Sequence, residues 1–175
     1  MKKMLGEERR QQILQLIQKR GTPVTGTELA QFANVSRQVI VNDMNLLKAK
    51  NEPIMSTSQG YYYFKQLEEN NFAQKVVCNH DPKDAKEELY AIVDCGATVV
   101  NVIVEHPIYG EITANLQLAN RLDVDRFIQQ VTLHNAELLS SLTDGTHIHT
   151  ISAPSREQLQ CAINSLREHG YLIEQ

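Results

Sequence analysis

Cysteine is scarce in this chain, and no apolar stretch is long enough to cross a membrane. The three cysteines, Cys78, Cys95 and Cys161, are an odd number and show no C-x-x-C spacing. This pattern argues against a disulfide framework and fits a reducing compartment. No apolar run approaches the roughly 20 residues of a membrane span, and the basic first segment lacks an apolar core of signal-peptide length. We therefore expect a cytoplasmic protein with no membrane partner.

Charge is distributed unevenly along the chain. Residues 1–65 contain ten Lys and Arg against five Asp and Glu, whereas residues 66–175 contain seven against sixteen. A basic first third before an acidic remainder predicts two domains, and the basic domain is the candidate for an anionic partner. We expect a DNA-binding domain over 1–65, a polar linker over 66–71 and a second domain over 72–175.

Three helical segments and a hairpin are predicted in the first third. Apolar residues recur at helical spacing over 7–19 before Gly21, Thr27 is the expected cap of a short helix, and Ser36 caps a helix over 37–50. The β-prone runs 53–57 and 60–64 flank a turn and predict a hairpin. Helices joined by a short turn and followed by a hairpin are the plan of a winged helix-turn-helix.

The third helix opens with side chains suited to DNA. Arg37 fits the guanine edge, Gln38 the adenine edge and Ser36 a phosphate, while Asn42 lies about one turn later. Asp43 is expected to pair with a neighbouring basic side chain instead. The alternative is a helical domain that binds protein, but the local positive charge favours double-stranded DNA.

The acidic remainder alternates β-prone and helical segments. The expected elements are strand 72–78, helix 84–94, strands 98–105 and 112–118, helix 124–142 with His134 inside it, strand 146–152, a helix after Ser155 and a short edge strand at 171–173. The first six follow the ferredoxin-like order β-α-β-β-α-β, with an extra C-terminal helix. The chain is therefore expected to be α/β (α+β), with the first and last strands side by side, antiparallel, at the sheet centre.

Two histidines in the last strand predict half of a metal site. His147 and His149 are two positions apart, so both project from one face of the strand. Pairing of the first and last strands brings His80 close to them. The helix after His80 carries Glu87 and Glu88, so a carboxylate can complete the set. Three nitrogens and one oxygen suit Zn, Ni, Fe or Mn, although an isolated His-x-His motif is more often solvated or structural.

A turn with two polar rings separates the middle strands, in the segment His106-Pro107-Ile108-Tyr109-Gly110. His106 and Tyr109 either pack locally in a hairpin or present polar groups to a ligand beside the metal.

These motifs resemble known regulators over essentially the whole chain. The segment from Val35 to Met44, with Leu46-Leu47 after it, looks like the winged helix-turn-helix of biotin-repressor-type regulators. Following that domain, His80 and the blocks 106–110 and 145–149 resemble the 3H-domain transcription regulators, which are named for their histidines. The best-known members of that family are niacin-responsive repressors of NAD biosynthesis and nicotinate uptake.

The resemblance implies a repressor with nicotinate as co-repressor and metal ligands at His80, Glu88, His147 and His149. We expect a homodimer on a DNA operator, a divalent metal, with Ni or Zn preferred over Fe or Mn, and a contact from His106 or Tyr109 to nicotinate. One alternative is a regulator of the same build that senses the metal itself. The other, a metal-dependent hydrolase with Glu87 or Glu105 as base, leaves the basic domain unexplained and lacks a nucleophile–base pair. We therefore expect no enzyme activity.

Overall fold

A computed structural model describes residues 5–64 and 71–174, and the chain folds as two compact units within residues 1–67 and 68–175. The predicted linker, 66–71, lies outside the described residues except for Asn71, so the predicted domain bounds remain predictions. No helix in the described part of the chain is long and apolar enough to cross a membrane.

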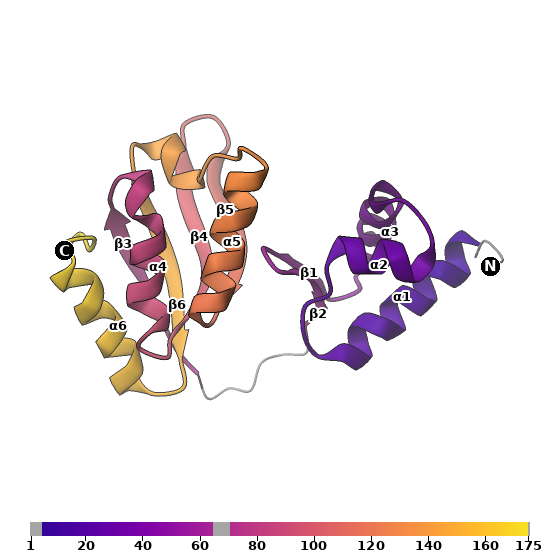
Figure 1. The fold of residues 1–175 in the computed structure, drawn as a ribbon, viewed down its shortest axis with the longest axis horizontal. Helices are drawn as coiled ribbons and strands as arrows, with labels where there is room; N and C mark the ends of the chain where they lie inside the picture. The colour runs from indigo at the N-terminus through magenta and orange to yellow at the C-terminus, as the bar shows by residue number, and fades with distance from the viewer. Residues whose placement is uncertain (1–4, 65–70, 175) are drawn as a thin grey trace. The chain divides into compact units, whose positions relative to one another are not determined.

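The first unit has the helices and hairpin that the sequence predicts (Figure 1). They are α1 (Gly6–Arg20), α2 (Gly26–Ala33), α3 (Arg37–Ala49), β1 (Ile54–Thr57) and β2 (Gly60–Tyr63). Ser36 caps α3 as expected, since its side chain accepts a hydrogen bond from the backbone N–H of Val39. The predicted cap Thr27 is wrong. Thr25 caps α2 because Glu28 stands three residues later and closes a reciprocal capping box.

A small apolar core joins the three helices to the hairpin. The core side chains with almost no exposed surface are Ile13, Ile17, Val24, Leu29, Ile40 and Met44. Val24 also pairs with Tyr61 of β2 through two backbone hydrogen bonds of 2.8 and 2.9 Å. The hairpin is therefore fixed to the helices as a wing.

The second unit is a four-stranded sheet with helices. Its elements are β3 (Phe72–Asn79), η1 (Pro82–Asp84), α4 (Ala85–Val93), β4 (Thr98–His106), β5 (Gly110–Leu118), α5 (Arg121–Leu133), η2 (Leu139–Thr143), β6 (Thr146–Ala153) and α6 (Arg156–Glu168). The strand order is β3-β6-β4-β5, and all three pairings are antiparallel. Helix α4 lies between α5 and α6 and packs on both (Figure 1).

The predicted element order and the antiparallel pairing of the first and last strands are confirmed. In each β-α-β unit an antiparallel strand lies between two parallel ones: β6 between β3 and β4, and β4 between β5 and β6. One detail differs, because β3 lies outside β6 rather than at the sheet centre. The β4–β5 hairpin occupies one side of β4, β6 pairs with the other side, and β3 pairs with the far side of β6. As predicted, the segment at 171–173 pairs with the outer edge of β3, where Cys78 bridges Leu172.

The predicted long helix 124–142 is wrong at its end. Helix α5 stops at Leu133, His134 is its C-cap residue, and Asn135 adopts the left-handed conformation with φ of 48°. The helical spacing of apolar residues continues through Leu138 and Leu139 because these side chains line a cavity, described below, and not because the helix continues.

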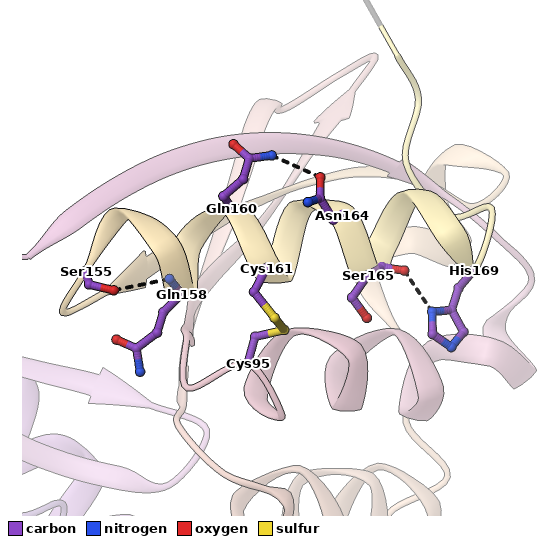
Figure 2. Close-up of a disulfide and its surroundings, with 8 residues drawn as sticks. All are labelled: Cys95, Ser155, Gln158, Gln160, Cys161, Asn164, Ser165 and His169. Carbon is purple, nitrogen blue, oxygen red and sulfur yellow. Dashed lines mark hydrogen bonds between the residues drawn. A yellow bond between two sulfur atoms is a disulfide. The ribbon is translucent and has the colours of Figure 1, made fainter.

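A disulfide joins Cys95, just after α4, to Cys161 of α6, contrary to the argument against disulfides drawn from the cysteine number and spacing (Figure 2). The two Cα atoms are 5.7 Å apart, although the residues are separated by 66 positions in sequence. No short spacing motif could indicate this pairing, since the packing of α4 against α6 creates it. Cys78 remains a free, buried thiol.

Candidate metal and ligand site

Glu88 is the centre of a buried cluster made by three elements. Alternation along β6 directs His147 and His149 toward the helices, α4 carries Glu88, and His80 follows the end of β3. The Nε2 atoms of His80, His147 and His149 lie 2.7, 3.1 and 3.4 Å from a carboxylate oxygen of Glu88. The structure therefore brings together all four residues predicted as metal ligands, and Glu88 itself is only 1% exposed.

The backbone fixes which nitrogen of each ring carries the proton. The Nδ1 atoms of His80, His147 and His149 each lie 2.8 Å from a backbone carbonyl oxygen, of Asp81, Gly145 and Asn101 respectively. A carbonyl oxygen only accepts hydrogen bonds, so Nδ1 must be the donor in each ring. In the neutral imidazole, Nε2 then presents a lone pair toward Glu88.

When the three rings are neutral, the Nε2 lone pairs and the Glu88 carboxylate face one another, and a positive charge between them would be stabilising. Although His80 Nε2 lies 2.7 Å from Glu88, it makes no hydrogen bond of acceptable direction and is a buried atom without a partner. Burial lowers the pKa of His80 and of His149, but Glu88 together with the backbone carbonyls of Asp81 and Asn101 raises the net pKa of both. Burial likewise raises the pKa of Glu88, but the histidines reverse this and hold it well below its usual value. Metal-ligating histidines commonly show this arrangement, with the distal N–H on a carbonyl, so the residues fit a metal ion.

Cys78 also belongs to this cluster, which the sequence reasoning missed. It lies opposite His147 in the β3–β6 register, and a ligand atom from each of Cys78, Glu88 and His147 lies within 4.8 Å of the others. Burial, followed by the charge of Glu88, raises the pKa of the Cys78 thiol. The sequence did offer a clue to this role, since Cys78 lies near the end of the predicted first strand, two residues before His80.

A cavity of about 250 Å³ adjoins the cluster and shares Glu88, His147 and His149 with it. Its other walls are mostly apolar: Ala85, Leu89, Val102, Ala114, Leu116, Phe127, Val131, Ala136, Leu138 and Leu139. Ser140 and Glu137 add polar groups, and no Lys or Arg is among the described residues that line it. The space is at the small end of ligand pockets, so it suits a ligand of about one ring.

The opening of α3 presents the predicted DNA-binding residues to solvent. Ser36, Arg37, Gln38 and Asn42 are all exposed, and the Gln38 amide lies 3.5 Å from that of Asn42. Asp43 turns inward as expected and accepts a hydrogen bond of 2.6 Å from Arg9 Nε. The first turn of α3 therefore exposes polar side chains, while the inner face of the helix is held by its contacts with the rest of the unit.

Comparison with known proteins identifies both units. The family model of the 3H domain matches residues 73–175, and that of an HTH domain matches residues 9–62. The chain belongs to the 3H-domain family. It is 47% identical over 174 residues to the transcription repressor NadR of Bacillus subtilis (strain 168), covering 98% of this chain and 97% of that one. It is 35% identical over 173 residues to the probable transcription repressor NiaR of Thermotoga maritima, covering 99% and 98%. The 3H-domain protein is thus a transcription repressor with a helix-turn-helix DNA-binding domain rather than an enzyme.

His106 and Tyr109, the two residues predicted to contact nicotinate, lie away from the cluster and the cavity. His106 is the last residue of β4 and Tyr109 lies in the turn after it, where the backbone N–H groups of Ile108 and Tyr109 lie 3.2 and 3.3 Å from His106 Nδ1. Tyr109 is 77% exposed, and neither residue lines the cavity. Within one chain the structure does not bring them to the cluster; the polar ring of His106 serves the turn.

Proposed function

We propose that this 3H-domain repressor controls genes of NAD biosynthesis and niacin uptake, with nicotinate as co-repressor beside a divalent metal. The names of the relatives NadR and NiaR support a link to NAD and niacin. The observation that carries the proposal is the convergence of three imidazoles on one buried carboxylate at the wall of a small apolar cavity.

His80, Glu88, His147 and His149 would hold the metal. Three nitrogens and one oxygen suit Ni or Zn, with Fe or Mn as alternatives. When bound, the ion supplies a positive charge and a Lewis-acidic position for a carboxylate or a pyridine nitrogen. The chain supplies the rest, because the backbone carbonyls orient the rings and the apolar walls exclude water.

The residues that line the cavity suit an aromatic acid only if a metal is bound beside it. Phe127, Val131 and Leu138 offer apolar contact for a ring, but the described lining provides no cationic side chain for a carboxylate. Arg121, at the start of α5, is engaged by Asp94 through hydrogen bonds of 2.7 and 2.6 Å. Without a cation, Glu88 would repel an anionic ligand. Nicotinate binding in this cavity therefore requires the metal.

DNA binding is assigned to a homodimer on a pseudo-palindromic operator. Half-sites about one helical turn apart, roughly 34–36 Å, follow from helix-turn-helix dimers in general. Arg37 and Gln38 would read base edges, with Ser36 and Asn42 beside them contacting the backbone or a neighbouring base. Nicotinate acts by stabilising the dimer conformation that fits the operator.

A second candidate is a regulator of the same architecture that senses the metal alone. It is favoured by one observation: the four-residue cluster is complete without any group in the cavity. This candidate requires DNA binding to follow metal concentration with no effect of nicotinate.

Operator affinity measured with and without nicotinate, before and after chelation, tests the proposal. We expect nicotinate to strengthen binding by metal-loaded protein and to have no effect after chelation. Glu88→Gln should abolish the response, whereas Glu87→Gln, an exposed neighbour on α4, should retain it. An equal response to nicotinate in chelated protein would separate the ligand from the metal. A response to metal alone would favour the second candidate.

A further inference from the structure

Cys78 lies where a fifth donor atom would stand. It is fully buried, with no exposed surface, and is paired in register with His147 across β3 and β6. Residues directly opposite in an antiparallel pair project from the same face. Cys78 therefore faces α4, and its sulfur lies within 4.8 Å of a carboxylate oxygen of Glu88 and a ring nitrogen of His147.

Two observations distinguish this thiol from an ordinary core cysteine. The other cysteines, Cys95 and Cys161, are joined to each other, so Cys78 is the one free thiol of the chain. It also adjoins a cluster in which His80 Nε2 is buried without a hydrogen-bond partner. An apolar side chain of similar size would satisfy packing at this position, but it would offer nothing to a cation.

We propose that Cys78 is an additional ligand of the metal, joining the three histidines and Glu88. The inference rests on the proposed function, because it presupposes a metal in this cluster. Coordination forms a metal–sulfur bond and releases the thiol proton to solvent. Metal–ligand bonds of about 2.0–2.3 Å, at the angles of a five-coordinate ion, place neighbouring donors roughly 2.8–4.0 Å apart. The donor atoms of Cys78, Glu88 and His147, which lie within 4.8 Å of one another, can therefore reach a common ion by small side-chain rotations.

A sulfur donor changes which metals suit the site. Thiolate favours Zn and Ni over Mn, which prefers oxygen ligands, whereas three imidazoles and a carboxylate discriminate weakly. The nitrogen and oxygen donors allow Zn, Ni, Fe or Mn. With Cys78 as a further ligand, Zn and Ni would be preferred.

Cobalt substitution of the full-length protein tests the assignment by a spectrum rather than by activity. Co(II) bound to a thiolate shows a sulfur-to-metal charge-transfer absorption in the near ultraviolet, which nitrogen and oxygen ligands do not produce. We expect this band in the cobalt-loaded wild type and its loss in Cys78→Ser, with the weaker visible bands of bound cobalt retained. The variant Cys95→Ser/Cys161→Ser is the matched control and should keep the band.

Bound cobalt in the wild type without the charge-transfer band would overturn the inference and leave the metal proposal intact. The same band in Cys78→Ser would also overturn it. Failure of the wild type to bind cobalt, Zn or Ni would overturn the proposed metal centre and this inference together. The wild-type spectrum decides the matter even if Cys78→Ser does not fold.

Discussion

The described residues bury two carboxylates, one in each unit, and their partners differ. Asp43 is 2% exposed and contacts Arg9 and Arg10 at 2.6 and 3.4 Å. Arginine is always charged, so Asp43 is neutralised by the chain itself. Glu88 contacts histidines, whose rings are neutral when they present lone pairs. The first carboxylate is therefore complete as a structural ion pair, whereas the second leaves a place for a cation.

Replacing Asp43 should destabilise the first unit. Asp43→Asn leaves the largely buried guanidinium group of Arg9 without its counter-charge, whereas Arg10 retains Glu7, and breaking a buried pair in this way costs about 3 kcal/mol or more. Urea denaturation would measure the loss. Glu8→Gln removes the same charge from an exposed position of α1 and should be nearly neutral. Equal losses in the two variants would show that Asp43 does not anchor α3 to α1.

Replacing Arg37 should change base preference without touching the 3H domain. Arg37→Ala removes an exposed side chain at the start of α3, with an expected cost of about 1–3 kcal/mol at one base pair. Competition between operator variants would locate that base pair. Nicotinate and metal binding should be unchanged, and their loss would mean that the two domains do not act separately.

At the scale of secondary-structure elements, the turn that leads into β6 positions the cluster of three histidines around Glu88. Gly145 has φ of +88°, its carbonyl oxygen accepts the hydrogen bond from His147, and a Cβ atom there would meet the His80 carbonyl oxygen at 2.4 Å. Only glycine permits both the conformation and the close approach. The turn thereby sets the positions of two of the four predicted ligands at once.

Gly145→Ala should therefore weaken metal binding. Because it displaces two ligands, we expect a loss of about 10-fold or more in a metal-competition titration. Gly110→Ala is the matched control, since Gly110 also has positive φ, +71°, but a Cβ there meets nothing within 4 Å. If both variants lose metal affinity equally, the close approach to His80 is not the cause.

The disulfide should stabilise the packing of α6 on α4. Cys95 and Cys161 close a loop of 66 positions, and cross-links of this span add up to about 4 kcal/mol. Reductant should therefore lower the denaturation midpoint of the wild type and leave that of Cys95→Ser/Cys161→Ser unchanged. An unchanged midpoint in the reduced wild type would contradict a stabilising role.

At the scale of the whole molecule, the uneven charge distribution predicts that operator binding and nicotinate binding respond differently to salt. Residues 1–65 carry a net positive charge and the remainder a net negative one. Operator affinity should fall linearly on a logarithmic scale with salt, by a slope of about 0.9 per phosphate contacted. Nicotinate affinity should change little, because the proposed site has mostly apolar walls. Operator binding that is insensitive to salt would exclude the basic domain as the reader.

The sequence predicted which residues form the cluster because strand alternation and the expected strand pairing were enough to bring them together. Alternation in β6 placed His147 and His149 on one face, and the pairing of the first and last strands added His80. The disulfide and the end of α5 escaped prediction because both depend on packing between distant segments: Cys161 meets Cys95 only through helix contact, and Leu138 is apolar for the cavity. For His106 the sequence allowed either local packing in the turn or a ligand contact, and in the structure its ring bonds to its own turn.

The carbonyl groups that hold the three imidazoles belong to the main chain, not to side chains. Substitutions at Asp81 and Asn101 that preserve the backbone path therefore leave the ring orientations unchanged. In many metal sites a carboxylate side chain orients the histidine, and a single substitution disrupts it. Here the residues around the three imidazoles can change identity without altering the carbonyl groups that orient the rings.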